Sequence, residues 1–396
     1  MSGAATAGDL ILTFNAGSST VKMGFHQIAG EHLHPVAQGV IDFRDDPFEI
    51  RLKHGDRHLS CPLEVGEQDG DAILSRAFDW LGDQFDLTRL AAIGHRVVHG
   101  GDQFTGPVLI GDDSLTRMRS LAALAPLHQP QSLRLIEATR ALRPDLVQTA
   151  SFDTAFHASQ QPLARRFAIP RALHDQGIMR YGFHGLSYQS ISRSLTRHAV
   201  PQQARVVAAH LGSGCSLCAM QGGVSQDSSM GFSTIDGVPM ATRSGALDPG
   251  VILHLTGQMG WSMAQVEAML YHQSGLLGVS GFEADTRELL ESPLPEAAEA
   301  IELFCFRIAG EVARLVTTLG GLDVLVFTAG IGENQPRIRS LVSDRLAWLG
   351  LRLDEGANAA NATRISRATS RVAAMVIPTD EESVIAQEAW GLLALA

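Results

Sequence analysis

The sequence predicts an α/β protein of two domains in which one strand-turn-strand plan is duplicated. Three observations predict it: a length of 396 residues, a strand-turn-strand pattern that occurs twice, and helical segments interspersed with strand-like ones. A chain of this length exceeds one ordinary core, and with 45% hydrophobic and 18% charged residues it is too apolar to be disordered. The domain boundary is expected near Ser151.

The first repeated unit covers residues 9–28. An apolar run at 10–12 leads into the turn Asn-Ala-Gly-Ser-Ser at 15–19, after which Val21, Met23 and Phe25 alternate with other residues. Alternation with a period of two on either side of small turn residues is typical of a strand, a tight turn and a second strand.

The second repeated unit covers residues 204–224. Its apolar run at 206–209 enters the turn His-Leu-Gly-Ser-Gly at 210–214, and residues 216–220 lead out of it. A third glycine-rich turn, residues 329–334, follows the strand-like residues 323–328. Helices are expected from near Pro336 and at 131–142, 186–198, 263–270, 297–319 and 382–395.

Charge and hydropathy exclude several classes of function. The net charge of −11 and the pI of about 5.7 leave no basic footprint for nucleic acid or an anionic membrane surface. Residues 1–10 lack the features of a signal peptide, and no later segment approaches the roughly 20 apolar residues of a membrane span. We therefore expect a cytoplasmic protein without nucleic-acid or membrane partners.

The four cysteines are too few and too scattered for a disulfide framework, so we expect them to be reduced and buried. Cys215 and Cys218 form a CxxC pair, but a zinc site needs a second pair or nearby histidines. If residues 215–220 form a strand, the two side chains also point to opposite faces. A metal role is not expected for them.

Glycine and serine in a turn let backbone N–H groups converge on an anion, so the three turns suit the phosphates and ribose of a nucleotide. No GxxxxGK[ST] run occurs, which excludes a P-loop enzyme. Gly330-Ile331-Gly332 lacks the third glycine of a dinucleotide fingerprint. Lys22, one of only two lysines in the chain, lies just after the first turn.

Two blocks of the sequence resemble the two signatures of the acetate kinase family: residues 15–22 (Asn-Ala-Gly-Ser-Ser-Thr-Val-Lys) and residues 181–187 (Tyr-Gly-Phe-His-Gly-Leu-Ser). The resemblance continues in family order through blocks 95–101, 152–157, 229–232, 242–245, 274–278, 330–334 and 379–382. These blocks span nearly the whole chain.

The resemblance implies the fold of the sugar kinase and actin superfamily: two α/β domains of duplicated, ribonuclease H-like topology with a nucleotide cleft between them, usually in a homodimer. Residues 1–151 would form an N-terminal domain on the acceptor side. Residues 152–380 would bind the nucleotide and dimerise. Residues 381–396 would form a C-terminal helix that returns to the N-terminal domain.

The implied reaction is the reversible, direct in-line phosphorylation of acetate by ATP, which gives acetyl phosphate and ADP. An acceptor carboxylate has a pKa near 4 by analogy with a glutamate side chain, so it is a nucleophile at neutral pH and needs no base. The obstacle is the repulsion between this anion and the charged end of ATP, so positive charge and positioning should supply the catalysis.

The resemblance assigns roles to particular residues. Arg96 would hold the acceptor carboxylate, while Arg243 and His184 would face the transferring phosphoryl group. Asp153 matches the catalytic aspartate, which we expect to orient Arg96 or a metal-bound water rather than to act as a base. The other implied residues are His128 for the substrate; Lys22, His210, Leu211, Gly212, Ser213, Gly214, Asp285, Thr286, Arg287, Gly330, Ile331, Gly332, Glu333 and Asn334 for ATP; and Asn15 and Glu381 for Mg²⁺ or Mn²⁺. If residues 96–98 are extended, Val98 shares a face with Arg96, so we expect it to touch the methyl group of the acceptor.

Three positions depart from the family pattern: Gln129, Ser213 and Ala329. None of them removes a charged group, so they should affect nucleotide affinity more than the type of reaction. Two alternatives stay open. The acceptor could be propionate or butyrate, which turnover of the three acids would decide, or the chain could be a nucleotide-dependent scaffold.

Overall fold

The computed structural model describes residues 8–17, 20–42, 48–63, 70–126 and 128–395. Contacts between Cα atoms divide the chain into two units, Met1–Phe156 with Asp380–Ala396, and His157–Thr379. We propose that these units are the two domains expected from the sequence, with the boundary a few residues after Ser151.

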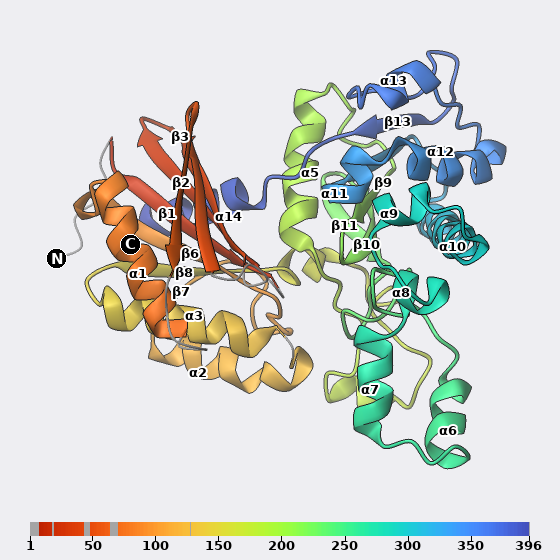
Figure 1. Cartoon of the computed structure of the whole chain (residues 1–396), viewed down its shortest axis with the longest axis horizontal. Coiled ribbons are helices and arrows are strands. Elements are labelled where there is room, and N and C mark those ends of the chain that lie inside the picture. The colour runs from red at the N-terminus through yellow and green to blue at the C-terminus, as the bar shows by residue number, and fades with distance from the viewer. Residues whose placement is uncertain (1–7, 18–19, 43–47, 64–69, 127, 396) are drawn as a thin grey trace. The chain divides into compact units, whose positions relative to one another are not determined.

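The N-terminal unit is built on one sheet with the strand order β5-β4-β3-β2-β1-β6-β8-β7 (Figure 1). β1 and β2 are antiparallel, as are β2 and β3, whereas β1, β6 and β8 run parallel. The strands are β1 (Leu10–Ala16), β2 (Thr20–Ala29), β3 (His32–Asp42), β4 (Phe48–His54), β5 (Arg57–Leu63), β6 (Leu90–Val97), β7 (Val108–Leu109) and β8 (Val147–Phe152).

Helices cover the central strands of this sheet from both sides. Leu12 of β1 belongs to the same core cluster as Phe78 of α1, whereas its neighbour Ile11 clusters with Ala386 of α14. Successive strand residues point to opposite faces, so a strand covered on both sides reads as a continuous apolar run. This explains the run at 10–12. The helices are α1 (Gly70–Gln84), α2 (Asp112–Ser120), α3 (Gln129–Leu142) and α14 (Glu381–Leu393).

The sheet of the second unit has the order β11-β10-β9-β12-β13. β9, β10 and β11 pair antiparallel, and β9, β12 and β13 run parallel. This order and these directions match β3-β2-β1-β6-β8 of the first unit, which confirms the duplicated plan. The strands are β9 (Val206–Leu211), β10 (Cys215–Gln221), β11 (Val224–Ser228), β12 (Val324–Thr328) and β13 (Ala373–Val376).

The longest helix of the second unit, α10 (Pro295–Leu319), packs against β9, β10 and β11. Its buried residues include Ile301, Phe304, Ile308 and Val312, whose spacing of three and four defines one apolar stripe. It ends at Gly320 in the left-handed region (φ +68°), a common helix stop. The other helices are α4 (Arg171–Asp175), α5 (Gly185–Arg197), α6 (Pro249–Gly257), α7 (Met263–His272), α8 (Gly275–Ser280), α9 (Thr286–Glu291), α11 (Ala329–Asn334), α12 (Pro336–Arg345) and α13 (Glu355–Ala359).

The strands and helices expected from the sequence are confirmed, with two differences. The third glycine-rich turn is the short helix α11 rather than an open turn. All four cysteines are free, but Cys61 lies on the edge strand β5 and is only half-buried. Among the described residues, no helix combines the length and apolar character that crossing a bilayer requires.

Candidate active site

The first glycine-rich turn follows β1, and its Asn15 is 4% exposed at the end of that strand. The Asn15 amide donates to Oε2 of Glu381 at 2.8 Å and to Oε1 of Glu382 at 2.9 Å. Both glutamates lie in the first turn of α14, which Asp380 caps through the N–H of Ser383. The sequence interpretation missed Glu382, although an acidic pair after a capping aspartate was a usable signal.

The two carboxylates beside Asn15 repel one another. Burial raises the pKa of Glu382, the charge of Glu381 raises it further, and Lys22 and the Asn15 amide oppose the rise. Ser18 and Ser19 of the same motif lie outside the described residues.

Arg96 and Asp153 form a buried ion pair. Arg96 is the penultimate residue of β6 and lies opposite Ser151 of the parallel strand β8, so Asp153 follows directly after the strand end. Arg96 Nη2 lies 2.6 Å from Asp153 Oδ2, and Nε donates to both carboxylate oxygens at 3.1 and 3.2 Å. The side chains are 14% and 2% exposed. Arg96 Nη1 also donates to Asn15 Oδ1 at 3.1 Å.

This arrangement keeps Arg96 fully charged. Burial lowers the pKa of its guanidinium, but the nearby carboxylates, Asp153 first among them, raise it more, and it ends above its ordinary value. The ion pair and the amide bond fix the guanidinium plane. The structure therefore gathers Asn15, Arg96, Asp153 and Glu381 within one unit.

Val98 is 2% exposed just beyond β6, two residues after Arg96. His128 lies immediately before α3, and Gln129 opens that helix with its side chain fully buried. Gln129 accepts from the N–H of His99 at 3.1 Å and donates to its carbonyl at 3.0 Å. Gln129 thus clamps the loop after Val98, which gives it a packing role inside the N-terminal unit.

In the second unit, the glycine-rich turn at 212–214 joins β9 to β10. His210 and His184 stack, with ring centroids 4.2 Å apart and planes 14° from parallel. His210 Nδ1 lies 2.8 Å from Ser187 Oγ, and His184 Nδ1 lies 2.8 Å from Ser216 Oγ. Ser216 is a further residue that the sequence interpretation missed, because a serine inside an apolar strand carries no motif signal.

The Nε2 edge of the His184 ring faces the turn. A Cβ placed on Gly214 would lie 3.4 Å from His184 Nε2 and 3.7 Å from Arg243 Nη1, so the imidazole and the guanidinium both border this glycine. Arg243 Nη1 donates to the Thr234 carbonyl at 3.1 Å. His184 itself has φ +57°, a left-handed conformation that is strained for a non-glycine residue and concentrates at functional sites.

The third glycine-rich segment, α11, begins beside this turn, because β12 runs parallel to β9 with Thr328 opposite His210. Glu333 accepts from the N–H of Ala329 at 2.8 Å, and Asn334 donates to the Gly330 carbonyl at 2.9 Å. The side chains of Glu333 and Asn334 thus stabilise the backbone of α11.

Ala329 has φ +64°, which a glycine would adopt without strain. Asp285 caps α9 and pairs with Arg287, two residues on, and Thr286 is buried between them in the sequence. The described polar contacts of Asp285 and Arg287 are therefore local to the start of α9.

A duplicated α/β fold with glycine-rich segments at its strand ends and cationic side chains beside them defines a class: phosphotransferases that use a nucleotide. Residues 10–387 match the model of the acetokinase family, and the chain belongs to that family. It is 45% identical to an acetate kinase of Rhodopseudomonas palustris (strain TIE-1) over 97% of this chain and 98% of that one. It is 44% identical to an acetate kinase of Nitrobacter hamburgensis over 97% and 96% of the two chains.

Solved structures of similar proteins agree with this family assignment. A propionate kinase from Francisella tularensis subsp. tularensis SCHU S4 superimposes with a TM-score of 0.90 at 38% identity, over 97% of this chain and 99% of that one. The acetate kinase of Porphyromonas gingivalis superimposes with a TM-score of 0.85 at 31% identity, over 97% and 100%. The protein is a kinase with the fold of this family.

Proposed function

We propose that the protein phosphorylates acetate reversibly with ATP, giving acetyl phosphate and ADP by direct in-line transfer. The observation that carries the proposal is membership of the acetokinase family over residues 10–387. The buried Arg96–Asp153 pair supports it, since a fixed guanidinium suits a carboxylate acceptor.

In this proposal Arg96 holds the acceptor carboxylate through the Nη side of its guanidinium, and Asp153, which accepts from Nε and Nη2, fixes the orientation of the guanidinium. The acceptor is already ionised at neutral pH, so Asp153 need not remove a proton. His184 and Arg243 present donors to the equatorial oxygens of the phosphoryl group, where negative charge is concentrated during transfer. His128 and His210 serve the same path.

The ATP site would be formed by Lys22 and by backbone of three segments of the second unit. The segments at 210–214 and 330–334 follow the adjacent parallel strands β9 and β12, so their N–H groups lie at one sheet edge. The third segment, 285–287, opens α9.

The carboxylates of Glu381 and Glu382 suit magnesium, and Asn15 would join them by turning its amide oxygen, which accepts from Arg96 in this structure, towards the ion. Nowhere in the described part of the chain do three His, Cys, Asp or Glu side chains gather as a metal-binding group. Mg²⁺, however, commonly takes one or two carboxylates, substrate phosphates and water. Asn15 and Glu381 would hold the ion, with Glu382 beside them, and Mn²⁺ could replace it. Bound there, the ion would neutralise phosphate charge and offset the charge of Glu381, which adds to burial in raising the pKa of Glu382.

We also propose a homodimer in the cytoplasm. α6 contains no buried residue although it is apolar, and Leu253, Met259 and Met263 are 71%, 55% and 67% exposed. A contiguous apolar surface of this kind suits a second copy of the chain. The four free cysteines fit a reducing compartment.

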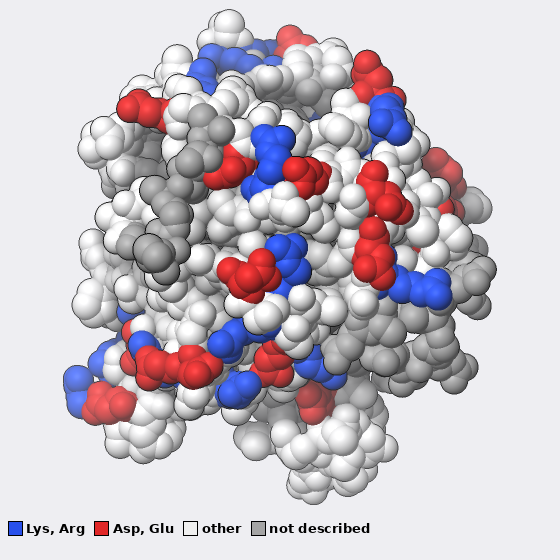
Figure 2. Space-filling model, turned by 90° about the vertical axis from the view of Figure 1, so that its left-hand side faces the viewer, with Lys and Arg blue, Asp and Glu red and all other residues white. Residues whose placement is uncertain are grey.

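On the face drawn in Figure 2, basic and acidic side chains lie interspersed, which suits small-molecule substrates better than a polyanion.

The proposed reaction predicts that acetate and Mg-ATP yield a product that hydroxylamine traps as acetohydroxamate. The measurement is the ferric hydroxamate colour, with acetate omitted in one control and magnesium in another. Magnesium-dependent loss of ATP without hydroxamate would contradict the proposal and favour a nucleotide-dependent scaffold.

Propionate is the second candidate acceptor, because one closely similar structure is a propionate kinase. Val98→Ala is expected to raise kcat/KM for propionate relative to acetate by roughly tenfold, since the lost methyl groups make room for about one methylene, worth about 1–3 kcal/mol in an apolar pocket. Parallel assays with acetate, propionate and butyrate measure the ratio, with Val97→Ala as the matched control because Val97 belongs to the hydrophobic core. An unchanged ratio in a folded Val98→Ala protein would place Val98 in the core as well.

A further inference from the structure

We propose that Arg180 is a positioning residue for His184: it fixes the entrance to the left-handed turn that carries the imidazole. The inference rests on the proposed function, in which His184 faces the transferring phosphoryl group. Arg180 lies outside the glycine-rich turns, and its guanidinium donates to Asp236 and to the carbonyls of Ser228 and Ser229, so its role would be exerted through the chain rather than on the substrate.

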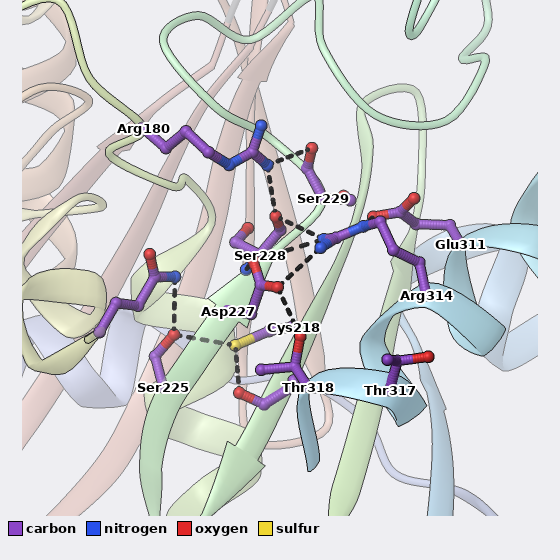
Figure 3. A network of polar contacts seen from close by, with 12 residues as sticks. Arg180, Cys218, Ser225, Asp227, Ser228, Ser229, Glu311, Arg314, Thr317 and Thr318 are labelled. Carbon is purple, nitrogen blue, oxygen red and sulfur yellow. Dashed lines mark hydrogen bonds and ion pairs between the residues drawn. The ribbon is translucent and has the colours of Figure 1, made fainter. Parts of the chain in front are cut away.

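The guanidinium of Arg180 donates to three acceptors, one at the end of β11 and two in the segment that follows it. Nη1 donates to Asp236 Oδ2 at 3.1 Å. Nη2 donates to the carbonyls of Ser228 and Ser229 at 2.7 and 3.2 Å (Figure 3). The side chain is 19% exposed and lies over the ring of Phe167. A point charge such as a lysine ammonium cannot reach three acceptors in this plane at once.

The end of β11, to which Arg180 donates, is also hydrogen-bonded to α10. Asp227 is 4% exposed and accepts from Arg314 at 2.7 Å and from Thr318 at 2.9 Å. Arg314 also donates to the Ser228 carbonyl at 3.0 Å, so the two arginines share this acceptor (Figure 3). Arg180 therefore connects the turn that carries His184 to β11 and, through Asp227 and Ser228, to α10.

Between Arg180 and His184 the chain takes two left-handed steps. Gly182 has φ +85°, and a Cβ there would lie 2.5 Å from the His157 ring, so only glycine fits. His184 has φ +57° without being a glycine, a conformation that persists only where its surroundings impose it. After His184, the N–H of Tyr188 in α5 donates to the His184 carbonyl. Before His184, the N–H of Tyr181 donates to the Gly231 carbonyl at 2.9 Å.

His157 holds the same turn from beneath. Its Nδ1 lies 2.9 Å from Ser225 Oγ and its Nε2 lies 2.9 Å from the Phe183 carbonyl. A carbonyl can only accept, so Nε2 carries the proton that it donates to Phe183. The contacts of Arg180, Tyr181 and His157 together fix the backbone that leads into His184, while Ser216 and His210 contact its ring.

A cavity beside Arg180 makes a sharp test available. Its volume is about 660 Å³, and Arg180, Arg314, Asp236 and Phe167 line it together with Leu163, which is 84% exposed. Because an exposed residue forms its rim, a small cation from solvent can enter. In Arg180→Ala, a free guanidinium ion could therefore occupy the place of the lost side-chain head.

Arg180→Ala is expected to lower kcat for acetyl phosphate formation by roughly 10- to 100-fold, as small displacements of catalytic groups do, while KM for acetate stays within about twofold. Guanidinium chloride at low, non-denaturing concentration should restore much of the loss. Arg180→Lys should remain impaired. The matched control is Arg205→Ala, which also loses an aspartate pair and a carbonyl bond in the same unit, but at the opposite end of β9 from His210; its kcat should not change.

An unchanged kcat in a folded Arg180→Ala protein would overturn the inference, and so would a loss that guanidinium leaves unaltered. If the alanine variant does not fold, Arg180→Lys tests the inference instead. A lower kcat at an unchanged KM for acetate would support the positioning role, and an unchanged kcat would overturn it. Histidine-labelled NMR gives a readout independent of turnover: the His184 ring signal, assigned with His184→Gln, should shift in Arg180→Ala and not in Arg205→Ala. A wild-type protein that makes no hydroxamate would defeat the proposed function, whereas an unmoved His184 signal would defeat the positioning role alone.

Discussion

Replacing Arg243 by alanine is expected to lower kcat by on the order of 10²-fold or more with only a modest change in KM. The guanidinium borders the same glycine as His184 Nε2, within the turn proposed to cradle phosphate. Charge accumulates on the phosphoryl oxygens as they are transferred, so a fixed cation at that place stabilises the transition state more than bound ATP.

Steady-state kinetics with acetate and Mg-ATP measure the effect. The matched control is Arg345→Ala, which removes an arginine that pairs with Glu302 on the surface of the same unit, and its kcat should stay within about twofold. A large rise in KM with nearly intact kcat would assign Arg243 to ground-state binding only.

Strands β1, β2, β9, β10 and β12 could be predicted from the sequence because the pattern that marks each of them is local. β1 and β9 are buried along their whole length, so each appears as an apolar run that ends in small turn residues. α10 shows a clear 3.6-residue stripe over 25 residues. The antiparallel return strands β2 and β10 follow their turns directly, so the duplicated plan was visible before any contact was known.

Strands β6, β7, β8, β11 and β13 were not predicted. Strands β3, β4 and β5 were not predicted either, because they extend the sheet towards its edge and carry polar side chains. In β3, His32 and His34 are exposed and alternation is interrupted by the bulge opposite Phe25 and His26. Such a strand is stabilised mainly by pairing with its neighbours, and pairing leaves a weak periodic signal in the sequence.

The residues of the candidate site that stand in motifs were predicted, whereas the residues that position them were mostly not. Arg96, Asp153 and His184 stand in recognisable motifs, but what fixes them comes from residues distant in the sequence, such as Glu382 for Asn15 and Ser216 for His184. Gln129 shows the limit most clearly. It departs from the family pattern and was expected to bear on nucleotide affinity, yet its amide clamps the backbone of His99, 30 residues earlier.

The last prediction separates an orienting role of Asp153 from a role as base. Asp153→Asn is expected to lower kcat/KM for acetate by on the order of 10²-fold, because the neutral amide cannot hold Arg96 through charged hydrogen bonds. Arg96→Ala should lose at least as much. If Asp153 acts only by orienting Arg96, the two losses will not multiply, and the double variant will resemble Arg96→Ala within about threefold.

A base, by contrast, would act on a proton whether or not Arg96 is present, and the two effects would then combine to roughly 10⁴-fold or more. The geometry favours the first result: Asp153 is 2% exposed, and both of its oxygens accept from Arg96. Asp145→Asn is the matched control, since this aspartate pairs with Arg143 on the surface of the same unit and its loss should leave kcat/KM unchanged. Urea unfolding of each variant checks that the double variant is folded, and multiplying losses in a folded protein would establish Asp153 as a group that acts on the substrate directly.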